Sequence, residues 1–591
     1  MTLNFDGFPW KRMLMVGTPF WSSAHKWKAL ALLGGAIACV IAKIAITVYI
    51  NDTNGSLWTA LKDGNASSFW WLLALNVGLI FLAMPTEVIG SVCKTTLGLT
   101  WRRFLSSEFL AGYFAGLAAL RLEQENARKP EAERIDNPEW RMTAECDSFA
   151  NTSISLFFSF FDAFLTIGTM GHVLWNMAPM LTFANIGYAL AGSALVYLLG
   201  RKLVDLTSRQ QKTEGDLRSG LTEARSQASQ IANYRGQEIA QGLANTRQNA
   251  VIDTLMDMMR VNRNIQCFTA LYYPLAPLVP MAILVFLNDQ SIDIGAIAKA
   301  QGTFNAMFGG MSVLVGNFGS LTFYTAIVNR LGTLMEFLKS EGVGKLPEGK
   351  FINISEGSKE IVLKDLTVKT PDDSTLIATL NMVVKPGESV LIRGPQASGK
   401  SALLNAILGT WPYGTGEIER PALKDVMIIT QQPFMQAMTL RQALTYPAAD
   451  GSESSDEKLR EILRLVDLED LVLPEKKNLG FDTLQNWREI LSLSQQQRLG
   501  LARIICKKPA YCLIDEASNS MEADNEKLLF TLFKTLGTTY FTAGNNQDLL
   551  KHHSWVLEIG EGGVTRLVKA SDYEPKVWPR LAGLMSYLST K

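Results

Sequence analysis

The chain has 591 residues, which is enough for several domains, and 47% of them are hydrophobic. Its 56 basic and 56 acidic residues give a formal net charge of zero, which excludes broad binding to nucleic acid or other polyanions. Six cysteines without a C-x-x-C pair and only four histidines exclude a disulfide framework and argue against a metal site built from cysteine and histidine.

The N-terminal half is the apolar half. Residues 1–27 mix aromatic and basic side chains without a cleavage site, which predicts an interfacial elbow helix rather than a signal peptide. Residues 28–337 then predict a helical transmembrane domain, since a spanning helix needs about 20 apolar residues. Six stretches qualify: 28–50, 69–92, 152–176, 181–200, 266–287 and 303–327. Only "NMAPM" separates the third from the fourth, so a tight helical hairpin is the alternative there.

The distribution of lysine and arginine predicts the orientation. With the N-terminus in the cytoplasm, the inner segments 93–151 and 201–265 carry eight and ten of these residues, and the outer loops carry only Lys62 and Lys299. This orientation also places the C-terminus in the cytoplasm. Both inner segments are polar, and we expect them to continue the spanning helices far into the cytoplasm.

Three charged residues fall inside the predicted spans, namely Lys43, Glu87 and Asp162. Charge within a bilayer is costly and normally faces a cavity or a partner, so these residues are candidates for a translocation pathway. Lys43 and Asp162 are a candidate ion pair, and Glu87 or Asp162 could couple transport to protons. The alternative is that the side chains snorkel to the interface or that a span edge is misplaced by a turn.

A linker over 338–358 leads into an α/β domain over 359–575 and a tail over 576–591. The buried strand "SVLI" is followed by "GPQASGKS", which matches G-x-x-x-x-G-K-[ST] in full, and then by a helix. Backbone N–H groups in such a loop bind nucleotide phosphates, the lysine neutralises their charge, and the serine binds Mg²⁺. The predicted nucleotide-binding residues of this loop are Gly394, Pro395, Gln396, Ala397, Ser398, Gly399, Lys400 and Ser401.

Further motifs complete a predicted ATPase site. "AYCLIDE" is an apolar strand that ends in Asp515, a candidate Mg²⁺ residue, and Glu516, a candidate general base for the attacking water. Gln431 follows another strand, at the candidate metal site. The element "LSLSQQQR" at 491–498 lies directly before "AYCLIDE" in the motif order, and kinase-like or RecA-like phosphate-loop proteins lack it.

On these motifs the chain resembles an ABC half-transporter, an exporter-type transmembrane domain with six spans fused to an α/β ABC ATPase domain. More narrowly, it resembles the SbmA/BacA-like group and the peroxisomal fatty-acyl (ABCD) transporters. The membrane half carries the group's elements as "WRRFLSSEFLAGYF" (101–114), "RIDNPEWRMTAECDSF" (134–149) and "NYRGQEIA" (233–240). Asn137, Pro138, Arg141 and Asp147 match the second element, and Trp140 replaces its usual glutamine.

The resemblance implies a dimer with two ATP molecules, each capped by the other subunit's signature helix. Ser492, Ser494 and Gln495 are then the signature residues that meet the partner's nucleotide. Family substrates include antimicrobial or symbiotic peptides, cobalamin, bleomycin-like drugs and fatty acyl-CoA, and bacterial members commonly import.

Two departures from the family concern the residues around ATP. Leu493 and Ser494 stand where the signature has two glycines, and Asn545 replaces the switch histidine. Asparagine can still hydrogen-bond near the γ-phosphate, as a candidate catalytic residue, but it carries no charge. Since the residues that carry the chemistry remain, we expect ATP hydrolysis that is real but slow, because one lost contact to developing charge lowers a rate by about 10²–10³-fold.

The favoured function is ATP-driven uptake of peptides or other amphipathic solutes by a homodimer in a bacterial inner membrane. The alternatives are an exporter that confers self-resistance, a fatty acyl-CoA transporter, and a nucleotide-gated regulator that transports nothing. A heterodimer with a partner of consensus signature and an organellar membrane also remain open. The expected cofactors are ATP and Mg²⁺, and the expected partners are a second copy, membrane lipid and the solute.

Overall fold

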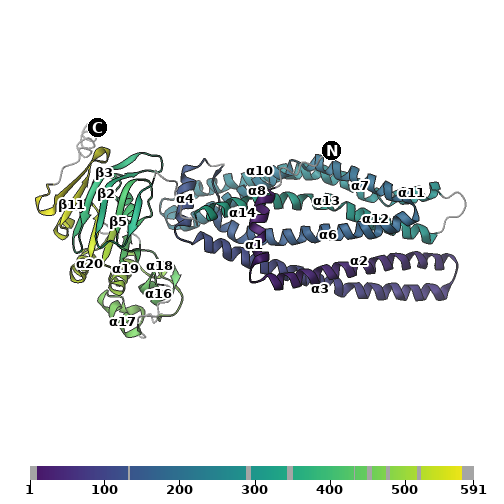
Figure 1. Ribbon diagram of the computed structural model, residues 1–591, viewed down its shortest axis with the longest axis horizontal. Helices are drawn as coiled ribbons and strands as arrows, with labels where there is room; N and C mark the ends of the chain where they lie inside the picture. Colours follow the sequence, from purple (N-terminus) through teal and green to yellow (C-terminus); the bar gives the residue numbers. More distant parts are fainter. Residues whose placement is uncertain are drawn as a thin grey trace. The chain divides into compact units, whose positions relative to one another are not determined.

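The computed structural model describes residues 9–130, 133–287, 294–341, 351–430, 433–448, 455–473, 480–515 and 521–574. The chain divides into two compact units, Met1–Gly344 and Lys345–Lys591. The first unit is helical and the second combines strands with helices (Figure 1). The predicted tail over 576–591 and residues 342–350 of the predicted linker lie outside the described residues.

The first unit, called the membrane unit below, consists of long helices and short connections. Four continuous helices of its described part are long and apolar enough to cross a membrane: α2, α3, the helical stretch Pro138–Met177, and α7. The helices are α1 (Trp10–Ser22), α2 (Lys26–Lys62), α3 (Ala66–Tyr113), α4 (Ala118–Arg128), α5 (Pro138–Trp140), the π-helical turn η3 (Arg141–Glu145), α6 (Cys146–Met177), α7 (Pro179–Gly200), α8 (Leu203–Ser226), α9 (Ala228–Asn233), α10 (Gln237–Leu275), α11 (Leu278–Leu287), α12 (Ile294–Met311), α13 (Val313–Gly316) and α14 (Phe318–Glu341).

The breaks between helices follow from local sequence. Ala178 is extended (φ −162°, ψ 113°) and Pro179 opens α7, so the "NMAPM" segment contains a one-residue break between two helices. The predicted fifth span runs from α10 into α11. The predicted sixth span crosses two breaks, at Ser312 and Asn317, and is divided among α12, α13 and α14. The count of six spans therefore stays a prediction.

Helices α2 and α3 lie side by side along most of their length (Figure 1). Small residues permit this approach: a Cβ atom at Gly90 of α3 would lie 3.2 Å from the Cβ atom of Cys39 on α2. Helix α6 packs against both α2 and α3, and α12 packs against α2 and α6. These contacts decide which polar side chains within the membrane unit meet.

The second unit, called the ATPase unit below, contains two larger sheets. One sheet has the order β12-β11-β4-β10-β9-β6; its strands from β11 to β6 are parallel, and β12 is antiparallel at the edge. The second sheet has the order β1-β5-β2-β3. The strands are β1 (Asn353–Glu356), β2 (Ile361–Lys369), β3 (Thr375–Val384), β4 (Ser389–Arg393), β5 (Gly414–Arg420), β6 (Val426–Thr430), β7 (Ala437–Met438), β8 (Gln485–Asn486), β9 (Tyr511–Asp515), β10 (Thr539–Ala543), β11 (Trp555–Ile559) and β12 (Thr565–Lys569).

The parallel sheet positions the predicted ATPase residues. Its register pairs Thr430, at the end of β6, with Asp515, at the end of β9, and Asp515 with Ala543, at the end of β10. The carboxyl ends of these strands and of β4 therefore meet at one edge, where open parallel sheets bind ligands. The accompanying helices are α15 (Lys400–Leu408), α16 (Leu440–Thr445), α17 (Asp456–Leu465), α18 (Trp487–Ile490), α19 (Leu493–Lys507) and α20 (Ala523–Leu536).

Candidate active site

The predicted phosphate loop connects β4 with α15. Its two glycines are needed where they stand: Gly399 has φ +95°, and a Cβ atom there would lie 2.9 Å from the Cβ atom of Leu376. A Cβ atom at Gly394 would lie 2.7 Å from the carbonyl oxygen of Ile559. The loop borders a cavity of 210 Å³, which is lined by Pro395, Gln396, Ala397 and Ser398 among others.

Lys400 opens α15 beneath this loop and is only 5% exposed. Its ammonium donates hydrogen bonds to the carbonyl oxygens of Gly394 (3.2 Å) and Pro395 (2.9 Å). The Ser398 hydroxyl is buried and has no hydrogen-bond partner among the described residues. A concave loop at a helix N-terminus, with a buried ammonium and an unpartnered hydroxyl, fits the phosphates of a nucleotide.

The two described residues of the predicted metal site meet directly. The Ser401 hydroxyl, on α15, donates to Oδ1 of Asp515, at the end of β9, over 2.8 Å. Oxygen ligands of this kind suit Mg²⁺. Glu516 and Gln431, the predicted general base and the third predicted metal residue, lie outside the described residues. Each directly follows a strand end that the register places at this edge.

Asn545 follows β10 and holds the first residue of the phosphate loop. Its side-chain oxygen accepts a hydrogen bond from the Gly394 N–H (3.2 Å), and its side-chain nitrogen donates to the Gly394 carbonyl (2.9 Å). The Arg393 guanidinium donates to the Asn545 carbonyl over 2.7 Å. Asn545 therefore lies at the predicted site, with both halves of its amide bonded to the protein backbone.

The signature residues form the N-terminus of α19. Ser492 is the N-cap: its hydroxyl oxygen accepts from the Gln495 N–H (3.3 Å), and the Gln495 side chain accepts from the Ser492 N–H (3.0 Å). The Ser494 hydroxyl accepts from the side chain of Asn525 (3.4 Å). Leu493 is 49% exposed, so its side chain stays at the surface beside this cap instead of entering the core.

Sequence reasoning missed Arg503, which connects the signature helix to the segment after Gln431. Its guanidinium donates to the carbonyl oxygens of Ala443 (2.6 Å) and Phe434 (2.9 Å) and lies 5.3 Å from the ring centre of Tyr446. Burial lowers the pKa of Arg503 to about 10, which leaves it charged at neutral pH. The only available signal was the motif context "QQQRLGLAR", which names the residue but not its partners.

His553 is buried and lies two residues before β11 begins. Its Nδ1 lies 2.7 Å from the Leu549 carbonyl oxygen, which can only accept, so Nδ1 carries the proton. Its Nε2 then accepts from the Thr542 hydroxyl over 2.8 Å. Burial lowers the pKa of His553 to about 4, so the ring is neutral at neutral pH. Its two hydrogen bonds indicate a structural role beside β10.

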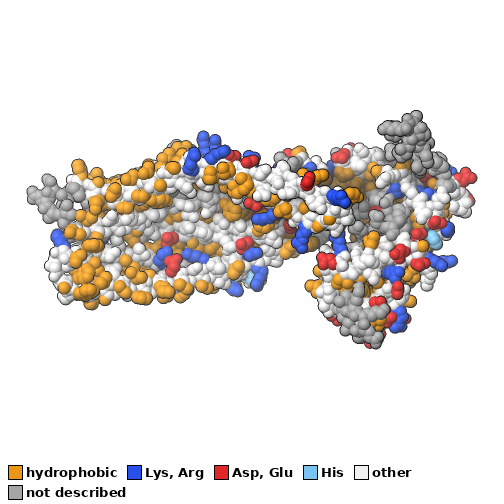
Figure 2. Space-filling model, turned by 180° about the vertical axis from the view of Figure 1, so that it is seen from behind, with side chains coloured by type: hydrophobic (Ala, Val, Ile, Leu, Met, Phe, Trp, Pro, Cys, Tyr) orange, Lys and Arg blue, Asp and Glu red, His pale blue; other side chains and the backbone are white. Residues whose placement is uncertain are grey.

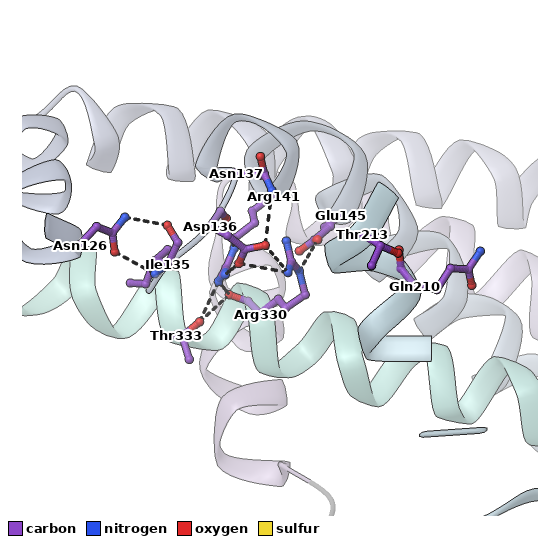
Figure 3. A network of polar contacts seen from close by, with 10 residues as sticks. All are labelled: Asn126, Ile135, Asp136, Asn137, Arg141, Glu145, Gln210, Thr213, Arg330 and Thr333. Carbon is purple, nitrogen blue, oxygen red and sulfur yellow. Dashed lines mark hydrogen bonds and ion pairs between the residues drawn. The ribbon is translucent and has the colours of Figure 1, made fainter. Parts of the chain in front are cut away.

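The family element around Asn137 forms a buried ionic network in the membrane unit (Figure 3). The Arg141 guanidinium pairs with Asp136 and donates to the Arg330 carbonyl (2.6 Å) and the Thr333 hydroxyl (2.9 Å). Arg330 pairs with Asp136 (2.8 Å) and Glu145 (2.6 Å). Two arginines thus balance two carboxylates, and the network connects the start of α6 to α14.

The pKa of Asp136 reports the strength of this network. Burial raises the pKa of the carboxyl, but the charges of Arg141 and Arg330, together with hydrogen bonds from both, outweigh burial and lower the pKa to about 2. The sequence had singled out Arg141 by its motif. It had not indicated Asp136, Glu145 or Arg330 as its partners.

The first family element of the membrane unit contacts the second. Arg102, from the first element, pairs with Asp147, from the second, over 3.2 Å. The neighbouring Trp101 stacks on Phe20 of the N-terminal helix α1, with ring centres 5.3 Å apart.

The three predicted pathway residues line one cavity. The cavity measures 360 Å³, lies among α2, α3 and α6, and includes Lys43, Glu87 and Asp162. The prediction that Lys43 pairs with Asp162 is wrong. Lys43 pairs with Glu87 over 3.0 Å, because α2 and α3 pack along each other. On the face shown in Figure 2, a small group of charged side chains interrupts the hydrophobic ones midway along the membrane unit.

Two family models match this chain. The model described as ABC transporter transmembrane region 2 matches residues 19–286, and the model described as ABC transporter matches residues 377–519. The solved structure of a bacterial Atm1-family ABC exporter with ATP bound gives a TM-score of 0.73 and covers 95% of this chain and 98% of its own, at 15% identity. That likeness confirms the predicted fold.

Two relatives extend over nearly the whole chain. An uncharacterized ABC transporter ATP-binding protein of Synechocystis is 31% identical and covers 94% of this chain and 85% of its own length. The human lysosomal cobalamin transporter ABCD4 is 25% identical and covers 94% of this chain and 95% of its own. The chain therefore belongs to the ABC transporter family, as a multi-pass membrane half-transporter of the ABCD type whose ATP-binding ATPase domain drives transport.

Proposed function

We propose that two copies of this chain form a homodimer that takes up peptides or other amphipathic solutes across a bacterial inner membrane, driven by slow ATP hydrolysis. The proposed ATP hydrolysis rests on the hydrogen bond between Ser401 and Asp515 beneath an intact phosphate loop. It joins the residue that would bind Mg²⁺ to the strand end that precedes Glu516. Retention of this arrangement supports hydrolysis rather than nucleotide binding alone.

The polar groups of the loop have separate expected roles when nucleotide binds. The Lys400 ammonium now bonds two loop carbonyls, and its charge would instead neutralise phosphate oxygens when ATP is bound. Backbone N–H groups from Gln396 to Lys400 would surround the phosphates. Mg²⁺, which ABC ATPases use generally, would bind the Ser401 hydroxyl with Asp515 in support, and Gln431 would contribute from the end of β6.

Glu516 would take the proton of the attacking water. Asn545 would keep the start of the loop in place through its two bonds to Gly394. This task differs from the charged contact that a histidine can provide to the γ-phosphate, and the loss of that contact supports a slow rate.

The dimer part depends on the signature helix. In a half-transporter, the N-terminus of α19 would meet the ATP bound to the partner. Because the Ser492 hydroxyl accepts a hydrogen bond through its oxygen, its own proton remains able to donate to a phosphate. Exposed Leu493 adds an apolar side chain where glycine would let the backbone approach closely, which supports slow turnover without excluding it.

A peptide or amphipathic solute suits a pathway that contains both charges and apolar surface. The cavity around Lys43 combines charged residues with the apolar side chains of Val40, Ile154 and Phe158. A cobalamin-like solute is the second candidate, because a relative of nearly equal length is a cobalamin transporter. Export, fatty acyl-CoA transport and nucleotide-gated regulation are separate outcomes of the test.

The test uses the full chain in proteoliposomes. Phosphate release and uptake of labelled peptide or cobalamin are measured for the wild type, for Glu516→Gln, and for Glu457→Gln, which removes an exposed carboxylate of α17. We expect Glu516→Gln to abolish ATP-dependent release and uptake and Glu457→Gln to preserve both. Equal release by the wild type and Glu516→Gln would reject hydrolysis by this chain. Hydrolysis coupled only to outward movement would reject uptake.

The homodimer is tested separately. We expect the purified chain to hydrolyse ATP without any other protein and to cross-link to itself when MgATP binds to Glu516→Gln. A chain that stays monomeric with MgATP and gains activity only with a second, consensus-signature half-transporter would reject the homodimer and support a heterodimer.

A further inference from the structure

Two charged residues of the cavity among α2, α3 and α6 have no ion-pair partner among the described residues. Lys43 and Glu87 neutralise each other at 3.0 Å. Asp162 also lines the cavity but has no hydrogen bond or ion pair with any described residue. Lys94 lines it too; its ammonium lies 4.7 Å from the ring centre of Phe158 and pairs with no described carboxylate.

The two unpaired groups have a defined spacing. Phe158, which contacts Lys94, and Asp162 are one turn apart on α6, so Lys94 contacts a position of α6 roughly 6 Å along the helix axis from Asp162. Both charged residues line the cavity. Hydroxyl groups of Ser155 and Ser159 add hydrogen-bonding capacity along the same helix.

An unpaired charge midway through a membrane unit is costly, and it normally has a partner or faces water. Here one carboxylate and one ammonium remain, and both line one cavity. A ligand with an ammonium and a carboxylate at a similar spacing would satisfy both at once. Extended residues span about 3.3–3.6 Å each, so the two ends of a dipeptide are separated by roughly this distance.

We propose that this cavity binds a zwitterionic solute the size of a dipeptide, with its ammonium on Asp162 and its carboxylate on Lys94. The volume of 360 Å³ lies within the range of small-molecule sites, about 300–1,000 Å³. The Lys43–Glu87 pair, next to the ligand, keeps the rest of the site neutral. The proposal deepens the proposed function of solute transport and rests on it.

The test measures binding of labelled alanyl-alanine to the full chain in lipid nanodiscs. N-acetylated and C-amidated forms of the same dipeptide are compared with it. We expect the wild type to bind the free dipeptide at least about tenfold more tightly than either blocked form, because each block removes one charge pair. Asp162→Asn should remove the preference for a free amino end alone, and Lys94→Gln the preference for a free carboxyl end alone.

Asp52→Asn is the matched control, since it removes a carboxylate from α2 that pairs with Lys299 outside this cavity. It should retain both preferences, and thermal unfolding should show that all three variants fold. Equal binding of the free and blocked dipeptides by the wild type would overturn the proposal. Loss of both preferences together in either single variant would also overturn it, because each charge would then act only through structure.

Failure of the site and failure of the proposed function give different results. ATP-driven uptake of another solute, without any preference for free ends in binding, would reject the zwitterion site and preserve transport. The expected end preferences, in a protein without ATP-driven uptake, would support the site and reject transport.

Discussion

The ATPase unit and the membrane unit place their polar residues by different means. In the ATPase unit, the predicted phosphate-loop and Mg²⁺ residues lie at or directly after the ends of parallel strands. The register therefore brings residues as distant in sequence as Ser401 and Asp515 to one edge. In the membrane unit, Lys43, Glu87 and Asp162 come from three separate helices, and only packing decides which of them pair. Motif residues in a sheet edge can therefore be located from sequence, whereas ion pairs between membrane helices cannot.

The two units also stabilise their charges differently. Lys400 is buried against loop carbonyls, in the place where phosphate would supply the opposite charge. The network of Asp136, Arg141, Glu145 and Arg330 is balanced within the chain and needs no ligand. The first arrangement is suited to catalysis and the second to holding helices together. Four experiments test this contrast.

The largest effect should come from Lys400→Ala. Loss of its charge should reduce ATP hydrolysis by at least about 10²–10³-fold, since one lost contact to transition-state charge has this effect. Phosphate release at saturating ATP measures it, and Lys534→Ala, an exposed lysine on α20, is the control. Retained hydrolysis in Lys400→Ala would mean that nucleotide is bound elsewhere.

The next effect is on stability and concerns the ionic network. Arg330→Met removes the partner shared by two carboxylates and should lower the free energy of unfolding by about 3–5 kcal/mol. The control Arg12→Met breaks a half-exposed pair with Glu336 and should lower it by less than about 1 kcal/mol.

Combining Arg330→Met with Glu145→Met should recover part of the loss. The double variant leaves Asp136 and Arg141 as a balanced pair, whereas the single variant leaves an excess carboxylate. Thermal unfolding in detergent measures all three variants. A double variant less stable than Arg330→Met would show that the network does not act through charge balance.

Acidification should destabilise the ATPase unit at a higher pH than the membrane unit. The folded ATPase unit holds His553 neutral, with a pKa of about 4 against an ordinary value of 6.5. The unfolded chain therefore binds a proton first, and the free energy of unfolding should fall by about 3 kcal/mol as pH drops from 6.5 to 4. Asp136 has a lowered pKa in the folded chain. Its contribution to the free energy of unfolding is therefore lost only below the ordinary pKa of 3.8, as pH falls to about 2.

Hydrogen exchange with mass spectrometry can follow both units in the full chain between about pH 7.5 and pH 4, which includes the range of the His553 effect. Exchange should rise in β10 and β11 before it rises around the ionic network. The variant His553→Gln, which does not titrate, should lose this pH dependence. A wild-type ATPase unit equally protected throughout this range would contradict the assigned neutral ring.

The smallest effect concerns the signature. Replacing Leu493 and Ser494 together by glycine removes the exposed leucine side chain and should raise ATP hydrolysis by about tenfold, or 1.4 kcal/mol of barrier. Phosphate release and MgATP-dependent cross-linking measure the change. Ser494→Gly alone should have less effect, because serine is small. A slower double variant would show that this family branch has adapted to Leu493.

Much of the ATPase site was predictable from sequence. The run "GPQASGKS" after an apolar strand predicted the loop, and "LIDE" predicted the strand end where Asp515 now meets Ser401. Asn545 was expected near the γ-phosphate, and it lies beside the phosphate loop, but the sequence did not indicate that both ends of its amide bond Gly394. The difference arises because motif spacing defines which strand a residue follows but not which backbone group its side chain reaches.

The membrane unit was predictable only in outline. Hydropathy predicted apolar helices, and α2, α3, α6 and α7 are present, but the breaks at Ser312 and Asn317 were not foreseen. Lys43 was expected to pair with Asp162 and instead pairs with Glu87. The hydrophobic periodicity of a helix predicts which face of that helix a residue occupies. It does not predict which neighbouring helix that face contacts.

By itself, the sequence determined the two-unit organisation, the order of the ATPase motifs and the residues that can perform chemistry, because each depends on local pattern. The sharing of Asp136 by Arg141 and Arg330 became evident only in the tertiary structure, as did the lack of an ion-pair partner for Asp162 and Lys94 among the described residues that line one cavity. Those outcomes depend on contacts between helices far apart in the chain, where charge and close packing must be satisfied together.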